Sequence, residues 1–451
     1  MAVLAAAGSA SQDGISNPPG LCFNYLQTLT LTARLEDFMP SLRRLLVPAA
    51  SLSLLIPAAA SASGFRLPES SIAGLGTANA LVANTTELGA LSYNPAAMSF
   101  HDGQGIAVGL IAVDPDISVT PSEGPSTGIK VKSQGDTRYL PSLIYSNRLT
   151  NRWSVGVNVN SPFGLETKWP RYTFIGPGGK KGFEPEHTKI EMLNINPNVA
   201  YKLGSNTSVA VGLNYYDLRD VVFNTHLIKI NGDGADWGWN LGLQHVAGPW
   251  SFGASYRSKV KVDVDGSIDG TAAGYGTSSA KSSIEFPDML QLGARYQVNP
   301  RLALELDYER TGWSSFDKLE IQQTAVPFPI VSTNNWEDSN TYRLGGTYQL
   351  TPKTQLRFGY AYDETPQPDQ YFSARVPDAN RQLFSIGVAH NIAGWTLEGG
   401  YMYVKFDKRT ISSGVNFGGL PLLTDPNGTD VYNGTYDSSV NLFGIGVSKK
   451  F

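Results

Sequence analysis

The chain ends in Ser-Val-Asn-Leu-Phe-Gly-Ile-Gly-Val-Ser-Lys-Lys-Phe, residues 439–451, where large apolar residues alternate with small or polar ones. Side chains of a β-strand point alternately to the two faces of a sheet, so this pattern predicts a strand. One face would carry Phe443, Ile445, Val447 and Phe451. The other face would carry Leu442, Gly444, Gly446 and Ser448. A soluble sandwich buries its apolar face, whereas a transmembrane barrel turns that face to lipid and the other to a lumen.

The composition favours a barrel over a bundle of membrane helices. The 451 residues include 47 Gly, 21 Tyr, 19 Phe and 8 Trp, and only 16% are charged. After the N-terminal region, no run of about 20 apolar residues occurs, which is the length that a membrane helix requires. The net charge of -4 provides no basic field, so we expect no nucleic-acid partner.

The N-terminal region has the features of an export signal. Residues 39–62 combine Arg43-Arg44, a short apolar stretch and Ala60-Ser61-Ala62, and so predict a signal peptide. Residues 1–38 are predicted to be an upstream extension that the mature protein lacks. A structured N-terminal domain is the alternative, but it would need its own core. The only cysteine, Cys22, would then be absent from the mature chain, which fits an oxidising compartment.

About fourteen segments after residue 103 have the period-two pattern of strands, and short connections alternate with long ones. The segments are 105–114, 137–149, 152–161, 189–203, 206–220, 236–247, 249–262, 281–298, 301–312, 338–350, 354–363, 380–391, 395–406 and 438–451. The alternation predicts an all-β fold, a transmembrane up-and-down antiparallel β-barrel with tight periplasmic turns and long outer loops.

Charged residues and one apolar patch fall on the predicted inner face. The inward arginines and carboxylates predict salt bridges across the lumen, and the sharper alternative is that an arginine holds a ligand carboxylate. The candidate cations for that role are Arg343, Arg357 and Arg381. The apolar patch consists of Leu383, Met402, Val404, Val440 and Leu442. It predicts either the wall of a site for an oily solute or a surface that packs against a plug.

Residues 63–102 are rich in small residues and turns and do not alternate as a strand. They contain Gly64-Phe65-Arg66-Leu67, Gly74-Leu75-Gly76 and Asn94-Pro95-Ala96-Ala97, in that order. In these elements the chain resembles the N-terminal hatch of the FadL (OMPP1/FadL/TodX) family of outer-membrane transporters for long-chain fatty acids and other hydrophobic compounds. The segments 153–165, 196–201 and 376–381 also resemble the family, so the likeness covers 63–451. Lys449 departs from the apolar residue that is frequent at that position.

The resemblance implies a hatch over 63–102 and a barrel over 103–451. It implies passive uptake of a long-chain fatty acid or another hydrophobic molecule through an apolar lumenal site, with hatch movement and lateral exit at a kink in the third strand. The kink residues would be Ser161, Pro162, Phe163 and Gly164, where Pro162 lacks an N–H and Gly164 permits unusual dihedral angles. The alternative is that these four residues merely end the strand.

The hatch residues Phe65 and Leu67 are expected to contact the ligand, and Asn94 and Pro95 to set a turn. The alternative is a plug packed for stability alone. The loop 163–188 carries Trp169, Tyr172, Phe174, Ile175 and Phe183. It is interpreted as a catching surface for lipid-like molecules, as a contact with lipopolysaccharide, or as a self-packed loop.

Three other functions are alternatives: a general or substrate-specific diffusion porin, an outer-membrane hydrolase, and an adhesin or purely structural barrel. None of the five histidines lies in a nucleophile motif, and neither an H-x-x-x-H spacing nor a mature cysteine offers a metal site. We therefore expect no enzyme activity, no metal and no cofactor. The expected location is the bacterial outer membrane, as a single barrel in contact with lipid and lipopolysaccharide.

Overall fold

The computed structural model describes residues 64–174, 183–413 and 430–451. The chain divides into two compact units, residues 1–59 and 60–451. The predicted upstream extension and signal peptide lie outside the described residues. Within the described ranges, no helix has both the length and the apolar character needed to cross a membrane.

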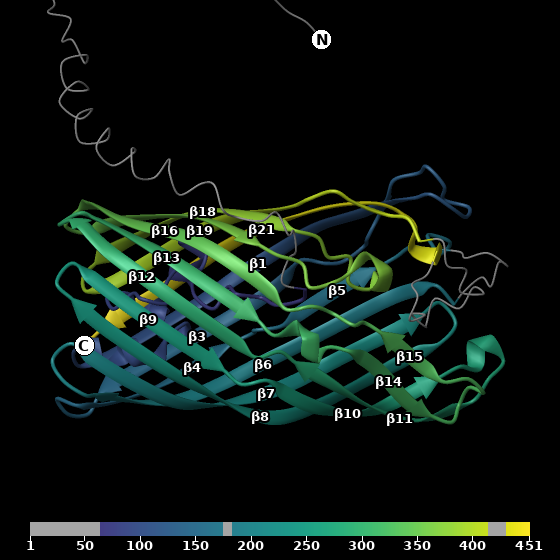
Figure 1. The fold of residues 1–451 in the computed structure, drawn as a ribbon, viewed down its shortest axis with the longest axis horizontal. Helices are drawn as coiled ribbons and strands as arrows, with labels where there is room; N and C mark the ends of the chain where they lie inside the picture. Colours follow the sequence, from purple (N-terminus) through teal and green to yellow (C-terminus); the bar gives the residue numbers. More distant parts are fainter. Residues whose placement is uncertain (1–63, 175–182, 414–429) are drawn as a thin grey trace, which may run out of the picture. The chain divides into compact units, whose positions relative to one another are not determined.

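The second unit is a closed antiparallel β-barrel of fourteen wall strands, several of them interrupted by a break (Figure 1). β1 (Gln104–Pro121) pairs with β21 (Gly434–Lys450) along its whole length, which closes the sheet. The continuous strands between them are β3 (Arg138–Arg148), β6 (Pro185–Lys202), β7 (Thr207–Thr225), β8 (Lys229–Ala247), β17 (Thr354–Asp363) and β18 (Arg381–Ile392).

The interrupted wall strands each consist of two labelled pieces. They are β4 (Trp153–Asn160) with β5 (Gly164–Lys168), β9 (Trp250–Arg257) with β10 (Val260–Asp269), β11 (Thr277–Phe286) with β12 (Met289–Asn299), β13 (Leu302–Thr311) with β14 (Lys318–Gln323), β15 (Ile330–Thr333) with β16 (Ser339–Thr351), and β19 (Trp395–Phe406) with β20 (Arg409–Ile411). A short β2 (Val131–Lys132) pairs with β1.

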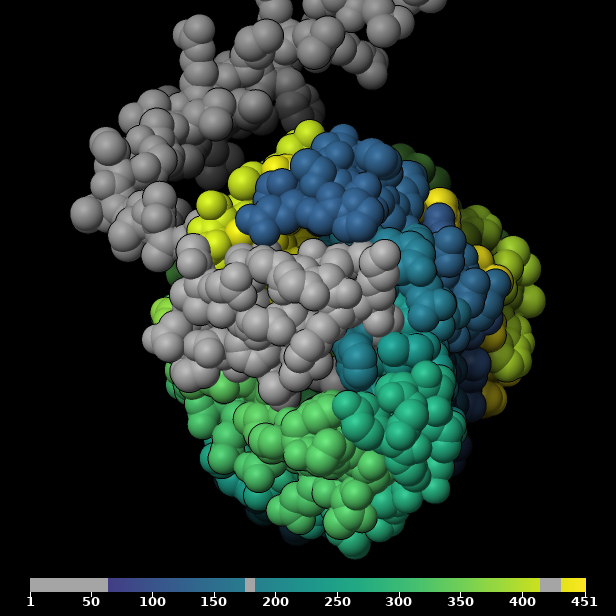
Figure 2. Space-filling view, turned by 90° about the vertical axis from the view of Figure 1, so that its right-hand side faces the viewer, coloured from purple at the N-terminus to yellow at the C-terminus, as the bar shows by residue number. Residues whose placement is uncertain are grey.

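The predicted alternation of short and long connections is confirmed. The short turns lie at the end of the barrel that carries the C-terminus, and the long connections lie at the opposite end (Figure 1). Figure 2 looks onto that opposite end, where segments distant in sequence meet around the rim. Every predicted strand is present, and several extend further outward than the period-two pattern indicated.

The predicted orientation of the faces is also confirmed. Ile445 is 71% exposed on the outside of β21, whereas its neighbour Leu442 is 3% exposed. On β13, Leu306 is 61% exposed and Glu305 is 1% exposed. A soluble fold would place its charges outside, so this pattern fits a barrel whose outer surface meets hydrocarbon.

A charge on this outer face should destabilise the barrel according to its depth. Ile445→Arg is expected to lower the free energy of unfolding in phospholipid vesicles by about 2–4 kcal/mol, because the guanidinium would lie in hydrocarbon. Leu203→Arg, beside a short turn, is the matched control and should cost about 0–1 kcal/mol. Denaturant titration followed by tryptophan fluorescence measures both values. Equal costs at the two positions would contradict the proposed depth of Ile445.

Residues 64–102 lie within the barrel and form a plug. The plug contains α2 (Ile72–Gly76) and the 3-10 turns η3 (Leu88–Ser92) and η4 (Pro95–Phe100). The remaining 3-10 turns, in outer connections, are η5 (Thr271–Ala273), η6 (Trp313–Ser315), η7 (Asp369–Tyr371) and η8 (Asp430–Tyr432). Nearly all plug side chains are buried, so the plug packs as a core and not as a loose strand.

Candidate ligand site at a break in the barrel wall

The third wall strand is broken between β4 and β5. Both pieces pair with β6, but among the described residues only β4 pairs with β3. The outer part of β3, Arg138–Ser142, therefore has a backbone ladder on its β1 side only. Pro162 lies in the break and has no N–H to donate. The result is a window in the wall, which we define as the unpaired stretch between Arg138–Ser142 and Ser161–Leu165.

The start of the plug takes the place of the missing strand partner at the break. The Leu67 N–H donates to the Pro162 carbonyl at 2.8 Å, and the Gly164 N–H donates to the Phe65 carbonyl at 3.0 Å. The Gly64 N–H donates to the Asp378 carboxylate at 3.0 Å. Burial raises the pKa of Asp378, in the outer connection before β18, to about 6, so this acceptor is ionised at neutral pH. The first plug residues are thus fastened between the break and an outer loop.

Gly164 lies where the start of the plug contacts the break, and its lack of a side chain leaves space there. Its φ is not positive, so the expectation that glycine supplies an unusual dihedral angle is wrong. A Cβ at this position would lie 2.7 Å from Leu67 Cδ1, well inside van der Waals contact. Glycine therefore leaves room for the Leu67 side chain, which would have to move if a Cβ were added.

A cavity of about 420 Å³ lies beside the window. Its lining includes Tyr139 and Leu140 of β3, which face the window from the opposite side. Of the residues predicted from sequence, the cavity brings together Phe65, Leu67, Ser161, Phe163, Gly164, Arg381 and Val440. The lining is mixed, with apolar side chains and several ionic groups, so it can enclose an apolar chain and also meet a polar end.

The Phe65 ring lines this cavity and packs within an aromatic cluster. Its centroid lies 4.7 Å from Trp313, 5.6 Å from Phe316 and 5.7 Å from Trp336. Phe163 of the break packs on the same ring at 6.1 Å. The three loop aromatics were not predicted from the sequence, although the frequency of aromatic residues after β13 was a usable signal.

The predicted apolar patch faces the plug. Leu383, Met402, Val404 and Leu442 are buried in one cluster with Ile72 and Leu75 of α2, and Val440 packs at its edge. Only Val440 of the five also lines the cavity. The patch therefore holds the plug, and its contact with a ligand stays a prediction.

The three predicted headgroup cations each have protein carboxylates as partners. Arg343 pairs with Glu309 at 3.2 Å, and Arg381 pairs with Asp363 at 2.7 Å. Arg357 pairs with Glu398 at 2.6 Å and with Glu87 of the plug at 2.7 Å. Salt bridges across the lumen were one of the two interpretations of these arginines. The other interpretation, that one of them holds a ligand carboxylate, stays a prediction.

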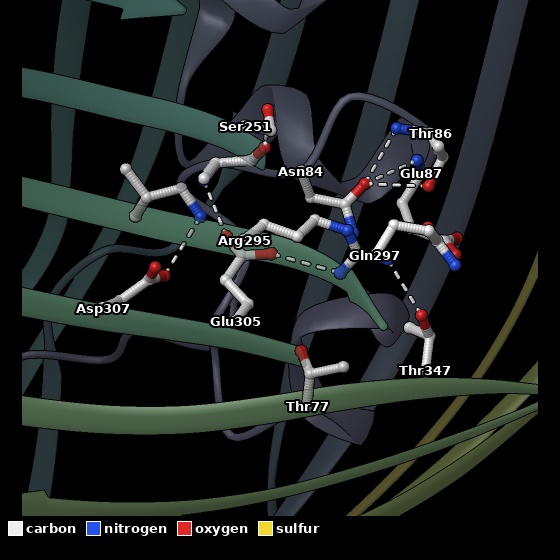
Figure 3. Close-up of polar contacts among 12 residues, drawn as sticks. Thr77, Asn84, Thr86, Glu87, Ser251, Arg295, Gln297, Glu305, Asp307 and Thr347 are labelled. Atoms are coloured by element: carbon white, nitrogen blue, oxygen red, sulfur yellow. Dashed lines mark hydrogen bonds and ion pairs between the residues drawn. The ribbon is translucent and has the colours of Figure 1, made fainter. Parts of the chain in front are cut away.

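Further polar contacts fasten the middle of the plug to the wall (Figure 3). The Val82 N–H donates to Asp307 at 3.0 Å and the Ala83 N–H to Glu305 at 2.6 Å, while Arg295 pairs with Glu305 at 3.3 Å. Asn94 caps η4, with Pro95 at its first position, and its amide donates to the Val82 carbonyl at 3.0 Å.

The aromatic outer loop packs against other outer segments as well as on itself where it is described. Trp169 and Phe174 are each 2% exposed and stack edge-to-face at 5.2 Å. Ile175 lies outside the described residues. Phe174 also lies 5.5 Å from the Tyr432 ring and the Trp169 Nε1 donates to the Ala374 carbonyl, whereas Tyr172 is 42% exposed. The three interpretations of this loop stay predictions.

A closed barrel with an apolar outer band, an inner plug and a cavity beside a wall opening has the architecture of a plugged outer-membrane channel. The chain belongs to the outer membrane protein transport protein family (OMPP1/FadL/TodX), whose model matches residues 53–451. The protein is therefore an outer-membrane transport protein, as the sequence resemblance implied.

Individual relatives agree with this assignment. The long-chain fatty acid transport protein of Escherichia coli (strain K12) is 25% identical over 389 residues, covering 74% of this chain and 86% of the relative. Outer membrane protein P1 of Haemophilus influenzae is 26% identical over 465 residues, covering 89% and 98%. The crystal structure of a Pseudomonas aeruginosa FadL homologue shares the fold, with a TM-score of 0.70, 19% identity and coverage of 86% and 100%. The Ralstonia pickettii toluene transporter TbuX has a TM-score of 0.60, 16% identity and coverage of 84% and 99%.

Proposed function

We propose that this protein takes up long-chain fatty acids or other hydrophobic molecules by passive diffusion and releases them sideways through the window between β3 and β5. The observation that carries the proposal is that the 420 Å³ cavity is lined by both edges of that window. The names of the relatives, long-chain fatty acid transport protein and toluene transporter, support a hydrophobic cargo.

The path follows from the energetics of an oily solute. Transfer of apolar surface from lipid or cavity into water costs about 25 cal/mol per Å², so a route that avoids the aqueous periplasm is favoured. A solute in the cavity would need only to displace the contacts of Phe65 and Leu67 at the break. A small outward movement of the first plug residues would then connect the cavity with the hydrocarbon of the membrane.

One chain supplies every part of this path. The cavity, the plug and both edges of the window come from residues 64–451 of a single polypeptide. We therefore propose that a single barrel in contact with outer-membrane lipid and lipopolysaccharide is sufficient for uptake.

The test compares hydrophobic uptake with ion conductance. Cells carrying the gene should accumulate ³H-oleate or a labelled alkane faster than cells lacking it, and the purified protein should show little steady conductance in planar bilayers, because the plug is fastened to the wall. Large steady conductance without hydrophobic uptake would instead identify a diffusion porin.

A further inference from the structure

The short-turn end of the barrel, where the C-terminus also lies (Figure 1), carries an excess of basic side chains. The six short turns, together with the strand residue on either side of each, contain no acidic residue. The whole chain has a net charge of -4, so its excess of acidic residues lies elsewhere. We define the basic rim as the seven cations of these turns and of the last three residues: Arg148, Arg152, Lys202, Arg301, Lys353, Lys449 and Lys450.

Most cations of the basic rim lack a carboxylate partner. Arg148 pairs with Asp102, in the connection between the plug and β1, and the other six form no ion pair with any residue that the structure describes. The outer end of the barrel differs in this respect, because exposed lysines there pair with carboxylates of the neighbouring strand. Lys259 pairs with Glu285 and Lys281 with Asp265, each at 2.6 Å. The basic rim therefore keeps charges that an external anion can neutralise.

Three of these cations gather at the turn between β3 and β4 and at the adjoining end of β6. The Lys202 N–H donates to the Arg152 carbonyl at 2.8 Å, so the two residues are neighbours. Arg148 lies within electrostatic range of Lys202. Arginine carries five N–H donors and lysine three, and like charges that crowd together repel one another unless an anion lies between them.

Contacts with aromatic groups orient two of the three cations. The Arg152 Nη1 donates to the Tyr201 hydroxyl at 3.1 Å. The Lys202 ammonium lies 4.8 Å from the centroid of the Phe100 ring. Neither contact neutralises a charge, and each leaves further N–H donors free to bind an anion from outside.

The three cations lie at the depth where lipid headgroups meet the barrel. Trp153 directly follows Arg152, is 48% exposed on the outer face, and stacks on Tyr201 with the ring centroids 4.7 Å apart. Tryptophan and tyrosine are enriched at the boundary between hydrocarbon and headgroups. Leu149 and Leu203, in the two turns, are exposed as well. A partner that fits this surface has an anionic head and a hydrocarbon part.

We propose that Arg148, Arg152 and Lys202 bind the headgroup of an anionic phospholipid of the periplasmic leaflet, whose acyl chains lie along the outer face of β4 and β6. The short turns of outer-membrane barrels face the periplasm, so the partner is a phospholipid and not lipopolysaccharide. Each cation near an anionic lipid surface contributes about a fivefold gain in affinity. A zwitterionic headgroup brings its own ammonium and is attracted less. The inference does not depend on which cargo the channel carries.

The experiment is native mass spectrometry of the purified, folded protein in non-ionic detergent. Titration with palmitoyl-oleoyl phosphatidylglycerol or phosphatidylcholine gives the affinity for the first bound lipid. The test variant is Arg152→Gln with Lys202→Gln, which keeps an amide donor beside Tyr201 and an aliphatic stem beside Phe100. Arg152→Lys with Lys202→Arg keeps both charges. Lys259→Gln with Lys281→Gln is the matched control, because it removes two exposed cations from the outer end. A heat-dependent shift in gel mobility reports that each barrel is folded.

Wild-type protein should bind phosphatidylglycerol more tightly than phosphatidylcholine. Arg152→Gln with Lys202→Gln should weaken phosphatidylglycerol binding by about 5- to 30-fold and leave phosphatidylcholine binding unchanged. The charge-keeping variant and the outer control should both retain the wild-type preference. Equal binding of the two lipids by the wild type would overturn the inference, as would wild-type affinity for phosphatidylglycerol in the folded glutamine variant.

An acidic polypeptide of the periplasm is the other anion that the basic rim would attract. Poly-L-glutamate provides the probe, since it has the charge but no hydrocarbon chains to lie against the barrel. At equal carboxylate and phosphate concentrations, it should displace little phosphatidylglycerol from the wild type. Tight binding of poly-L-glutamate, with no preference between the two phospholipids, would overturn the inference and identify a polypeptide surface instead.

Discussion

Replacing Pro162 by Thr and Gly164 by Val is expected to reduce uptake of a labelled hydrophobic solute to the level of cells that lack the gene. Threonine restores the backbone N–H that proline lacks, so β4 and β5 could continue as one strand beside β3. Valine at 164 would place its Cβ 2.7 Å from Leu67 Cδ1, so the Leu67 side chain would have to move. Both changes act on the window and leave the rest of the ladder intact. The measurement is the initial rate of ³H-oleate accumulation at equal surface expression.

The matched control removes one proline and one glycine away from the window. Pro197 faces outward in the middle of β6, and a Cβ at Gly204 would meet nothing within 4 Å. Pro197→Thr with Gly204→Val should therefore transport at the wild-type rate. Normal uptake by the Pro162/Gly164 variant, with its barrel folded, would refute lateral exit at this break but not the barrel.

Deletion of Gly64–Leu67 should abolish high-affinity binding of a hydrophobic ligand while the barrel still inserts. Phe65 and Leu67 line the cavity. Phe65 also packs against Trp313, Phe316 and other aromatic rings. The deletion also removes the pair between Arg66 and Glu309, which are 2.6 Å apart. Among the described residues, the only strand-type contact of this segment with the wall is at the break, so we expect the barrel to insert without it. Affinity should fall by at least about tenfold, since a buried aromatic side chain contributes more than 1.4 kcal/mol.

Equilibrium binding of ³H-oleate to detergent-purified protein measures the affinity, and the heat-dependent shift in gel mobility reports the folded barrel. Deletion of Ser126–Ile129, also four residues, is the control, because this exposed outer turn does not line the cavity. Unchanged affinity after the Gly64–Leu67 deletion would show that the plug start forms no part of the site.

The sequence predicted the wall of the barrel well because strand faces are a local property. Period two in Trp153–Asn160 or Leu302–Thr311 assigns each side chain to lipid or lumen without knowledge of any partner strand. The family resemblance implied the kink at Pro162, and the missing N–H of proline gives its local reason. Local reasoning gave the wrong reason for Gly164, because the approach of Leu67 comes from a segment nearly 100 residues earlier.

Which charges are neutralised was decided only by the tertiary structure. Arg357 meets Glu87 across a separation of 270 residues, and Arg375 is placed against Thr188 across 187 residues. Sequence proximity carries no information on such pairs, so the inward arginines predicted salt bridges across the lumen without identifying the partner carboxylates. The amino-acid pattern determined a barrel in a membrane, because lipid selects one face of every strand. The folded chain alone decided which side chains meet inside the barrel, because such contacts join segments that lie far apart in the sequence.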